Sequence, residues 1–421
     1  MSDNSIPFAA FCDTMLGDAA RDSFAPARGG NQRSLRLSNE RLALSLTRLY
    51  GAITKVELAR LSGLSLQATS TILNRLEAEG LMERGEPVRG RVGQPTVPYG
   101  LAASGAYSLG LKVGALSAEL SLINFLGIVQ CSSSMSYSRL DLAAVGGFAA
   151  RASVLAVHTL PARQRSRIAG MGVCWPNALR THLGDFVRAA LAEEGSAQTL
   201  ARLPIFIANP AAAACAAELF FGRAPRPQRF AYFFVSAAVH GAVALNCSIH
   251  PGRSSLSTDG EGASDASIRR ASLTRLEESV RGIGLDTSSI WSRHDAWPDY
   301  GAALNKWIVE AGGAIAQAAL EAAGIIDFDA VIVDGIFPLS VRARLATAAG
   351  EAIGRDMKGY AGSIEVREGS VGPFAPSLGA AALPLLGAFN NGELGAGVES
   401  YALPQLQAAA PTRRSGPSET A

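Results

Sequence analysis

The spacing of apolar residues between positions 54 and 80 predicts two short helices joined by a turn. Thr54 precedes Glu57 by three positions, a capping-box pattern in which each side chain satisfies a backbone N–H of the other residue at a helix start. The apolar run that follows is broken at residues 62–65, where Gly63 tolerates the positive φ of a turn. Ser65 can cap a second helix, in which four apolar residues recur at helical spacing: Ala68, Ile72, Leu73 and Leu76.

The second predicted helix also has a polar face. Short polar side chains near a helix N-terminus can hydrogen-bond base edges in the major groove, and an arginine further along can bind a phosphate. We therefore expect this helix to be a recognition helix. Its predicted DNA contacts, of which Arg75 suits a phosphate, are Ser65, Gln67, Thr69, Ser70, Asn74 and Arg75.

A segment rich in glycine, proline and arginine follows Gly80. Leu81 and Met82 begin an extended stretch, and residues 83–95 supply the turn residues of a hairpin. Arg89 and Arg91 at its tip can reach phosphates or a narrow minor groove. Two helices followed by such a hairpin are typical of a winged helix-turn-helix DNA-binding domain, which we place at residues 33–100. The alternative is a small helical bundle with a solvated basic loop.

The distribution of charge supports contact with DNA. Between positions 33 and 100 there are ten Lys or Arg residues and six Asp or Glu residues, a net charge of +4. The rest of the chain carries 28 basic and 30 acidic residues, a net charge of −2. A local basic excess favours binding to the phosphate backbone.

Length and composition limit the class of protein. A chain of 421 residues with 48% hydrophobic content can build two or three domains with sizeable cores. Its five cysteines are widely separated, which predicts free thiols in a reducing cytoplasm. No signal pattern begins the chain, and prolines interrupt the weakly charged stretch 203–217, so we expect no membrane span. Residues 1–32 and 405–421 lack periodicity and are predicted to be disordered tails.

Apolar strands alternate with alanine-rich helices from position 105 onward. Three strands, 107–114, 118–125 and 127–130, are expected to form a meander, and a long helix is expected around 140–160. Mixed sheets flanked by helices imply a large α/β domain. Further strands are predicted at 168–174, 204–207, 230–235, 241–245 and 330–334.

Four segments, at 63–76, 91–95, 217–222 and 371–382, occur in an order and spacing that resembles the ROK family of sugar kinases and sugar-responsive repressors. The similarity is greatest to the regulator branch, in which a winged helix-turn-helix precedes an actin-like ATPase (ribonuclease H-like) domain, and it covers residues 38–392. It implies an α/β fold with a two-lobed domain at 105–392. The small lobe would comprise about 105–203 plus the last helix, and the large lobe about 204–376.

This chain departs from the kinases of that family at the positions that carry catalysis. Where those kinases hold ATP phosphates with Asp-x-Gly-Gly-Thr, residues 112–116 read Lys-Val-Gly-Ala-Leu. Their Asn-Asp pair, whose Asp accepts the proton of the sugar hydroxyl, is here Asn209-Pro210, and proline has no acid–base group. The second phosphate loop, 235–241, is bulkier than the family's run of glycines. We therefore expect a catalytically inactive domain that needs no cofactor.

The resemblance also concerns a metal site and a sugar site. The stretch 260–270 contains neither His nor Cys, so we expect no counterpart of the family's zinc site. Asn209 lies where family members hydrogen-bond a sugar hydroxyl, and Glu261 lies near their sugar-contacting Glu, so both are candidate effector contacts. The alternatives are that Asn209 only caps the following helix and that Glu261 is a solvated loop residue.

Taken together, the sequence predicts a cytoplasmic, sequence-specific transcription regulator, and the resemblance favours a repressor over an activator. The expected partners are double-stranded DNA, a small-molecule sugar effector and further copies of the chain in a dimer or tetramer. A two-fold dimer would present two recognition helices to half-sites one helical turn, or a multiple of it, apart. One alternative is an active ATP-dependent sugar kinase that carries a DNA-binding domain. Another is a DNA-binding protein whose α/β domain binds no small molecule and only dimerises or docks a protein.

Overall fold

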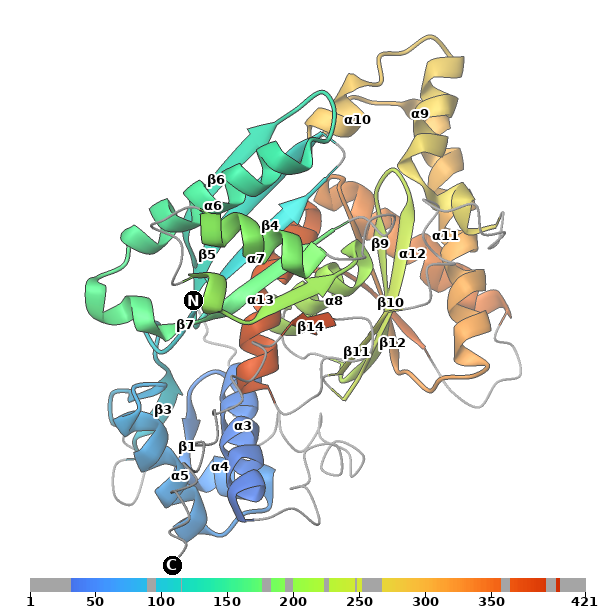
Figure 1. Ribbon diagram of the computed structural model, residues 1–421. Helices are drawn as coiled ribbons and strands as arrows, with labels where there is room; N and C mark the ends of the chain where they lie inside the picture. The colour runs from blue at the N-terminus through green and yellow to red at the C-terminus, as the bar shows by residue number, and fades with distance from the viewer. Residues whose placement is uncertain are drawn as a thin grey trace, which may run out of the picture.

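The chain folds into a small helical domain and a larger α/β domain (Figure 1). The predicted tails, except Gln32, lie outside the residues that this computed structural model describes. The described residues are 32–88, 96–114, 116–175, 183–193, 200–222, 227–246, 248–251, 267–356, 364–390 and 399–401.

The small domain is a winged helix-turn-helix. Its helices are α3 (Gln32–Tyr50), α4 (Lys55–Ser62) and α5 (Leu66–Ala78). Its three-stranded antiparallel sheet has the order β1 (Ile53–Thr54), β3 (Pro98–Leu101) and β2 (Met82–Arg84). The sequence pattern predicted the domain and its last two helices, whereas α3 was not predicted.

The predicted helix caps are present. Thr54 N–H donates to Glu57 Oε2 at 2.8 Å, and Glu57 N–H donates to Thr54 Oγ1 at 3.3 Å, which completes the capping box of α4. Gly63 ends α4 with φ of 71°, a conformation that side chains with a Cβ rarely adopt. Ser65 Oγ accepts from Ala68 N–H at 3.2 Å at the start of α5. The helix-turn-helix is therefore specified locally by its own sequence.

The first sheet of the α/β domain has the order β14-β8-β7-β4-β5-β6. Its first three strands in the sequence form the predicted antiparallel meander, and the next two run parallel to the first. Helices α6 (Leu142–His158) and α7 (Leu183–Glu193) cover its outer face. The strands are β4 (Tyr107–Val113), β5 (Ser117–Asn124), β6 (Val129–Ser136), β7 (Ile168–Cys174), β8 (Ile205–Ala208) and β14 (Glu399–Tyr401).

The second sheet repeats this pattern. Its order is β11-β10-β9-β12-β13, with an antiparallel meander and two strands parallel to the first of them. A duplicated sheet of this kind gives the two lobes of an actin-like ATPase fold, as expected. The strands are β9 (Arg229–Val235), β10 (Val239–Leu245), β11 (Ser248–Pro251), β12 (Ala330–Gly335) and β13 (Glu365–Glu368).

One predicted boundary is wrong. The large lobe was expected to begin near residue 204, but β8 pairs in parallel with β7 and therefore belongs to the first sheet. Helices α9 (Leu273–Gly282), α11 (Gly301–Ala323) and α12 (Leu339–Asp356) pack on the second sheet, and the short α10 (Ser288–Ser292) adds to this layer.

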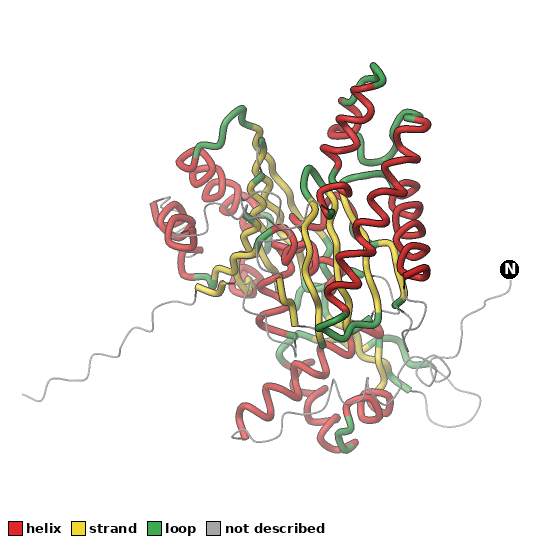
Figure 2. The backbone as a smooth tube through the Cα atoms, turned by 90° about the vertical axis from the view of Figure 1, so that its right-hand side faces the viewer, coloured by secondary structure: helices red, strands yellow, loops and turns green. Residues whose placement is uncertain are grey.

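Two central helices lie between the sheets, α8 (Pro210–Phe221) and α13 (Ala375–Phe389). Helix α8 packs on the second sheet, α13 packs on β4 and β7, and the two helices pack on each other. In the side view of Figure 2 the small helical domain lies below this layered body. The segment 372–389 is apolar and long enough to cross a membrane, but 67% of it is buried inside the protein, as in a core helix.

The contact between α8 and α13 is made by small residues. A Cβ added at Gly379 of α13 would lie 1.6 Å from the Ala213 carbonyl oxygen of α8. On the other side, a Cβ at Gly172 of β7 would lie 1.8 Å from the Ala380 carbonyl oxygen. Residues 211–217 of α8 are all buried. Neither Gly379 nor Gly172 can therefore gain a methyl group unless α13 moves away from α8 or from β7.

We expect Gly379→Ala to lower the free energy of unfolding by about 3 kcal/mol or more, because the added methyl group overlaps backbone of α8. Gly313→Ala in α11 is the matched control, since its Cβ would meet no atom within 4 Å and alanine favours a helix by up to about 1 kcal/mol. Thermal and urea unfolding measure both. Equal stability of the two variants would contradict the close packing of α8 and α13.

Candidate nucleic-acid interface and candidate effector site

The exposed face of α5 carries three polar side chains. Gln67, Thr71 and Asn74 are exposed, and their spacing of four and then three residues places them on one side of the helix. Thr71 Oγ1 donates to the Gln67 carbonyl oxygen at 3.1 Å. Sequence reasoning missed Thr71, although its helical spacing from Gln67 and Asn74 could have indicated it.

The expectation that Thr69 lies on this exposed face is wrong. Its side chain is fully buried, at 0% exposure, and its Oγ1 donates to the Ser65 carbonyl oxygen at 3.0 Å. Position 69 is four residues from Leu73 and seven from Leu76, so helical periodicity turns it toward the core. Ser70 is half-buried beside it.

Ser65 and Arg75 have partners within the domain. Ser65 is exposed, but its hydroxyl caps α5. Arg75 Nε lies 2.8 Å from Glu79 Oε1 and 3.3 Å from Glu40 Oε1, and Glu40 belongs to α3. Arg75 thus joins α5 to α3, and a DNA phosphate would have to compete with two carboxylates for it.

The base of the predicted wing is a hairpin. Val88 and Thr96 exchange backbone hydrogen bonds of 2.8 and 2.9 Å across two antiparallel segments. Residues 89–95 between them lie outside the described residues. The predicted DNA contacts Arg89 and Arg91 are among them.

Arg48 and Arg167 each make contacts between the small domain and the α/β domain. Arg48 of α3 lies over the Phe220 ring of α8, 3.9 Å from its centroid, and over the Phe125 ring at 4.9 Å. It also donates to the Phe125 carbonyl oxygen at 3.0 Å. Arg167, just before β7, donates to the carbonyl oxygens of Glu79 and Gly80 at 3.1 and 3.3 Å, beyond the end of α5.

The end of α13 is also attached to α3. Arg41 Nε donates to the Ala388 carbonyl oxygen at 3.1 Å, and Ser45 Oγ donates to Asn390 Oδ1 at 2.8 Å. With the Arg48–Phe220 contact, both central helices therefore end against α3. The sequence gave no signal of these contacts, because they join residues more than 170 positions apart.

Asn209 is the N-cap of α8. It is 6% exposed, and its Oδ1 accepts from Ala212 N–H at 2.8 Å, while Pro210 occupies the first helical position. The capping role is present in the structure, and a role toward an effector stays a prediction. The other predicted effector contact, Glu261, lies outside the described residues.

Lys112, near the end of β4, forms an ion pair with β5. Its Nζ lies 3.3 Å from Glu119 Oε1. Among the described residues, no group of three or more His, Cys, Asp or Glu side chains could hold a metal ion. Residues 252–266 are outside that set, and the expected absence of zinc stays a prediction.

Asp334, a buried acidic residue that sequence reasoning missed, lies near the carboxyl end of β12. Asp334 is fully buried and accepts hydrogen bonds from Tyr232 Oη at 3.0 Å and from Gly372 N–H at 2.9 Å. Arg342 Nε lies 3.1 Å from its Oδ1. Burial raises the pKa of Asp334, and the Arg342 charge opposes that rise. The cluster fixes the loop that leads into α13.

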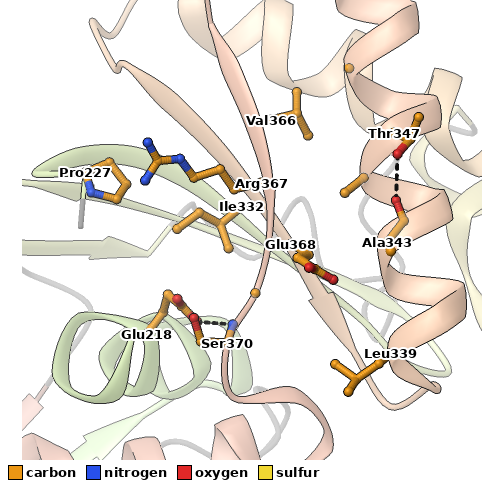
Figure 3. A pocket seen from close by; sticks show the side chains of 13 residues that line it. Glu218, Pro227, Ile332, Leu339, Ala343, Thr347, Val366, Arg367, Glu368 and Ser370 are labelled. Carbon is orange, nitrogen blue, oxygen red and sulfur yellow. Dashed lines mark hydrogen bonds between the residues drawn. The ribbon is translucent and has the colours of Figure 1, made fainter. Parts of the chain in front are cut away.

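A cavity of ≈ 530 Å³ lies beside β13 (Figure 3). Its lining comes mainly from α12, β13 and the loop after it, with Ile332 of β12, Pro227, and Glu218 of α8 completing it. Glu218 Oε2 accepts from Ser370 N–H at 2.9 Å, which joins α8 to that loop. The cavity includes neither Asn209 nor Lys112, so it is separate from the predicted effector site.

The fold is similar to solved structures although the sequence matches no family model and no curated protein. A ROK family transcriptional regulator, described as a homologue of the E. coli MLC protein, superimposes with a TM-score of 0.56 and 14% identity, over 84% of this chain and 97% of that one. A ROK hexokinase from Thermus thermophilus gives a TM-score of 0.46 and 20% identity, over 66% of this chain and 98% of that one. A TM-score below 0.5 is too low to establish a common fold. The chain therefore has the fold of a protein described as a ROK family transcriptional regulator, here a winged helix-turn-helix domain before a two-lobed, actin-like α/β domain.

Proposed function

We propose that this protein is a cytoplasmic, sequence-specific transcription regulator of the ROK family, acting as a repressor. The observation that carries the proposal is the exposed row of Gln67, Thr71 and Asn74 on a capped helix of a winged helix-turn-helix. Amide and hydroxyl groups are the side chains that read base edges in the major groove. The regulator with the similar fold supports the same role.

The α/β domain is proposed to sense a ligand and to form oligomers without phosphorylating sugar. Its α8 begins with Asn209-Pro210, where a carboxylate would be required as general base, and continues through residues 211–217 without an acid. Lys112 is paired with Glu119 where phosphates would bind in a kinase. Asn209 Oδ1 already accepts a hydrogen bond from Ala212 N–H as the cap of α8. A sugar bound there would therefore accept hydrogen bonds from the side-chain amide N–H groups of Asn209.

Helix α8 offers a direct mechanical link between the two proposed activities. Its first residue follows the candidate effector contact Asn209, and Phe220 near its last turn contacts Arg48 of the DNA-binding domain. A buried helix moves as a rigid body, so a shift at Asn209 would also displace α3. In a two-fold dimer this would change the spacing of the two recognition helices.

Selection of bound duplexes from a random DNA pool tests sequence-specific binding. We expect the full chain to recover a palindromic motif, because a two-fold dimer reads the same half-site twice. Gln67→Ala should relax the preference at one position of each half-site, at a cost of about 1 to 3 kcal/mol for the preferred base.

Thr69→Val is the control within the same helix. It should leave base preference unchanged and lower the free energy of unfolding by about 1 kcal/mol, through loss of the hydrogen bond to the Ser65 carbonyl oxygen. No enrichment by the full chain, or an equal loss of preference in both variants, would overturn the assigned reading face.

Sugar phosphorylation is expected to be absent. Purified protein supplied with Mg-ATP and a panel of hexoses and amino sugars should produce no sugar phosphate above the rate without protein, because Pro210 cannot accept a proton. A coupled ADP-release assay measures this. Turnover that is lost on Asn209→Ala would instead support the alternative, an active kinase that carries a DNA-binding domain.

Arg48→Met should loosen the attachment of the DNA-binding domain. The variant keeps an apolar side chain but removes the cation–π contacts and the hydrogen bond to Phe125, together about 1 to 3 kcal/mol. Amide hydrogen exchange in α3 and at the end of α8 should accelerate, while exchange in α11 should not change. Arg36→Met, on the exposed side of α3, is the control. Identical exchange in both variants would argue against the proposed link.

A further inference from the structure

Leu66, the first residue of α5, is a large apolar side chain that the domain leaves in solvent. It is 51% exposed, whereas Leu64, two residues earlier, packs against the hydrophobic core. The start of the helix does not depend on it either, because the Ser65 hydroxyl supplies the cap. The fold therefore gains little from a leucine at position 66.

The attachment of α5 to the α/β domain lies at the other end of the helix. Arg167 donates to the carbonyl oxygens of Glu79 and Gly80, beyond the last turn of α5. The 13 residues of α5 span about 20 Å, so Leu66 lies at the end away from this attachment. Figure 1 shows α5 in the small domain, below both sheets. Leu66 and Gln67 are both exposed, and the start of α5 is thus open to a partner as large as a duplex.

The charges along α5 favour DNA at its start rather than at its end. Its first turn contains no acidic residue, whereas Glu77 lies in its last turn and Glu79 follows it. The neighbouring helix α4 differs, because Glu57 lies in its first turn. Backbone N–H groups and the helix dipole make an acid-free N-terminus favourable for the phosphates that flank a major groove. The first turn of α5 is therefore the part of the helix suited to lie in the groove.

Leu66 directly precedes Gln67, which begins the exposed polar row of α5. When the N-terminal end of a recognition helix enters the major groove, its first residues meet neighbouring base pairs. Among the donors and acceptors that base pairs present there, the C5-methyl group of thymine is the one apolar group. We propose that Leu66 packs on this methyl group, so that each half-site contains a thymine next to the base pair read by Gln67.

This inference rests on the proposed function and adds to it the identity of one base. The polar row alone accounts for hydrogen bonds to base edges, and it leaves the exposed leucine beside it without a role. A leucine on a methyl group removes apolar surface of both partners from water. The preference for thymine over cytosine at this position then comes from the methyl group, which cytosine lacks.

Removal of the methyl group from the DNA tests the contact. Uracil pairs as thymine does and presents the same hydrogen-bonding groups, but it has hydrogen at C5. The full chain is first used to select its motif from a random pool, and duplexes of that motif are then prepared with uracil at each thymine in turn. Fluorescence anisotropy measures their affinity. We expect one thymine in each half-site, next to the position that Gln67→Ala relaxes, at which uracil weakens binding about fourfold per half-site, as for one methyl group returned to water.

Variants of the protein assign the effect to Leu66. Leu66→Ala should bind the thymine and uracil duplexes equally, because its shorter side chain does not reach the methyl group. Leu66→Met keeps a long apolar side chain and should retain part of the difference. Leu155→Ala, the same substitution at an exposed position of α6, is the control and should discriminate like the unaltered chain. Urea unfolding should show similar stability for all three, since both leucines are exposed.

A change of base gives a second readout of the same contact. Replacing the assigned thymine by cytosine, and adenine by guanine opposite it, should weaken binding by the unaltered chain. Methylation of that cytosine at C5 should recover part of the loss, because it restores the methyl group without restoring the oxygen at C4. Leu66→Ala should not distinguish the methylated from the unmethylated duplex.

Two results would overturn the inference and leave the proposed function intact. One is a recovered motif whose affinity falls with uracil at none of its thymines. The other is an equal loss on uracil in Leu66→Ala and in the unaltered chain, since another residue would then read the methyl group. Failure of the unaltered chain to enrich any motif would instead contradict the proposed function, and this inference with it.

Discussion

The close packing of α8 against α13 is the contact on which the rest of the structure depends. The two helices touch through backbone and methyl groups, with Gly379 of α13 against the Ala213 carbonyl oxygen of α8. One helix lies on each lobe, so this contact sets the distance between the two sheets. Dispersion forces at such short range are strong in sum, and a gap of about 0.5 to 1 Å already loses roughly a quarter to a half of each contact. The lobes therefore have few relative positions available to them.

The same two helices determine where the winged helix-turn-helix domain lies. Both end against α3, through Arg48 on Phe220 and through Ser45 on Asn390. Arg167 adds a separate attachment at the end of α5. Beside these polar contacts lies an apolar one, because Leu42 and Leu46 of the small domain belong to the same buried hydrophobic cluster as Phe125 and Phe220. The small domain is therefore attached to the central helices through a shared apolar core as well as through hydrogen bonds.

Sequence patterns were sufficient wherever local chemistry decides the structure. The capping box at Thr54, the cap at Ser65 and the extended segment from Leu81 followed from short motifs, and the meander from 107 onward followed from apolar spacing. Thr69 was placed on the wrong face because a polar residue was assumed to be exposed, whereas its hydroxyl is satisfied by the backbone of its own helix. The predicted boundary between the lobes near residue 204 was wrong because the pairing of β8 with β7 joins residues that are distant in the sequence. Arg48, Arg167 and Asp334 could not have been found, since their partners are distant in sequence.

The exposed face of α5 is chemically independent of the core beneath it. Gln67, Thr71 and Asn74 point outward, while Thr69, Leu73 and Leu76 on the opposite face carry the packing. Substitutions on the outer face leave the buried contacts of the helix intact, so the exposed chemistry can change without a change of fold. On the proposed function, duplicated copies of such a gene could acquire different target sequences one base pair at a time while keeping the same lobes and the same central helices.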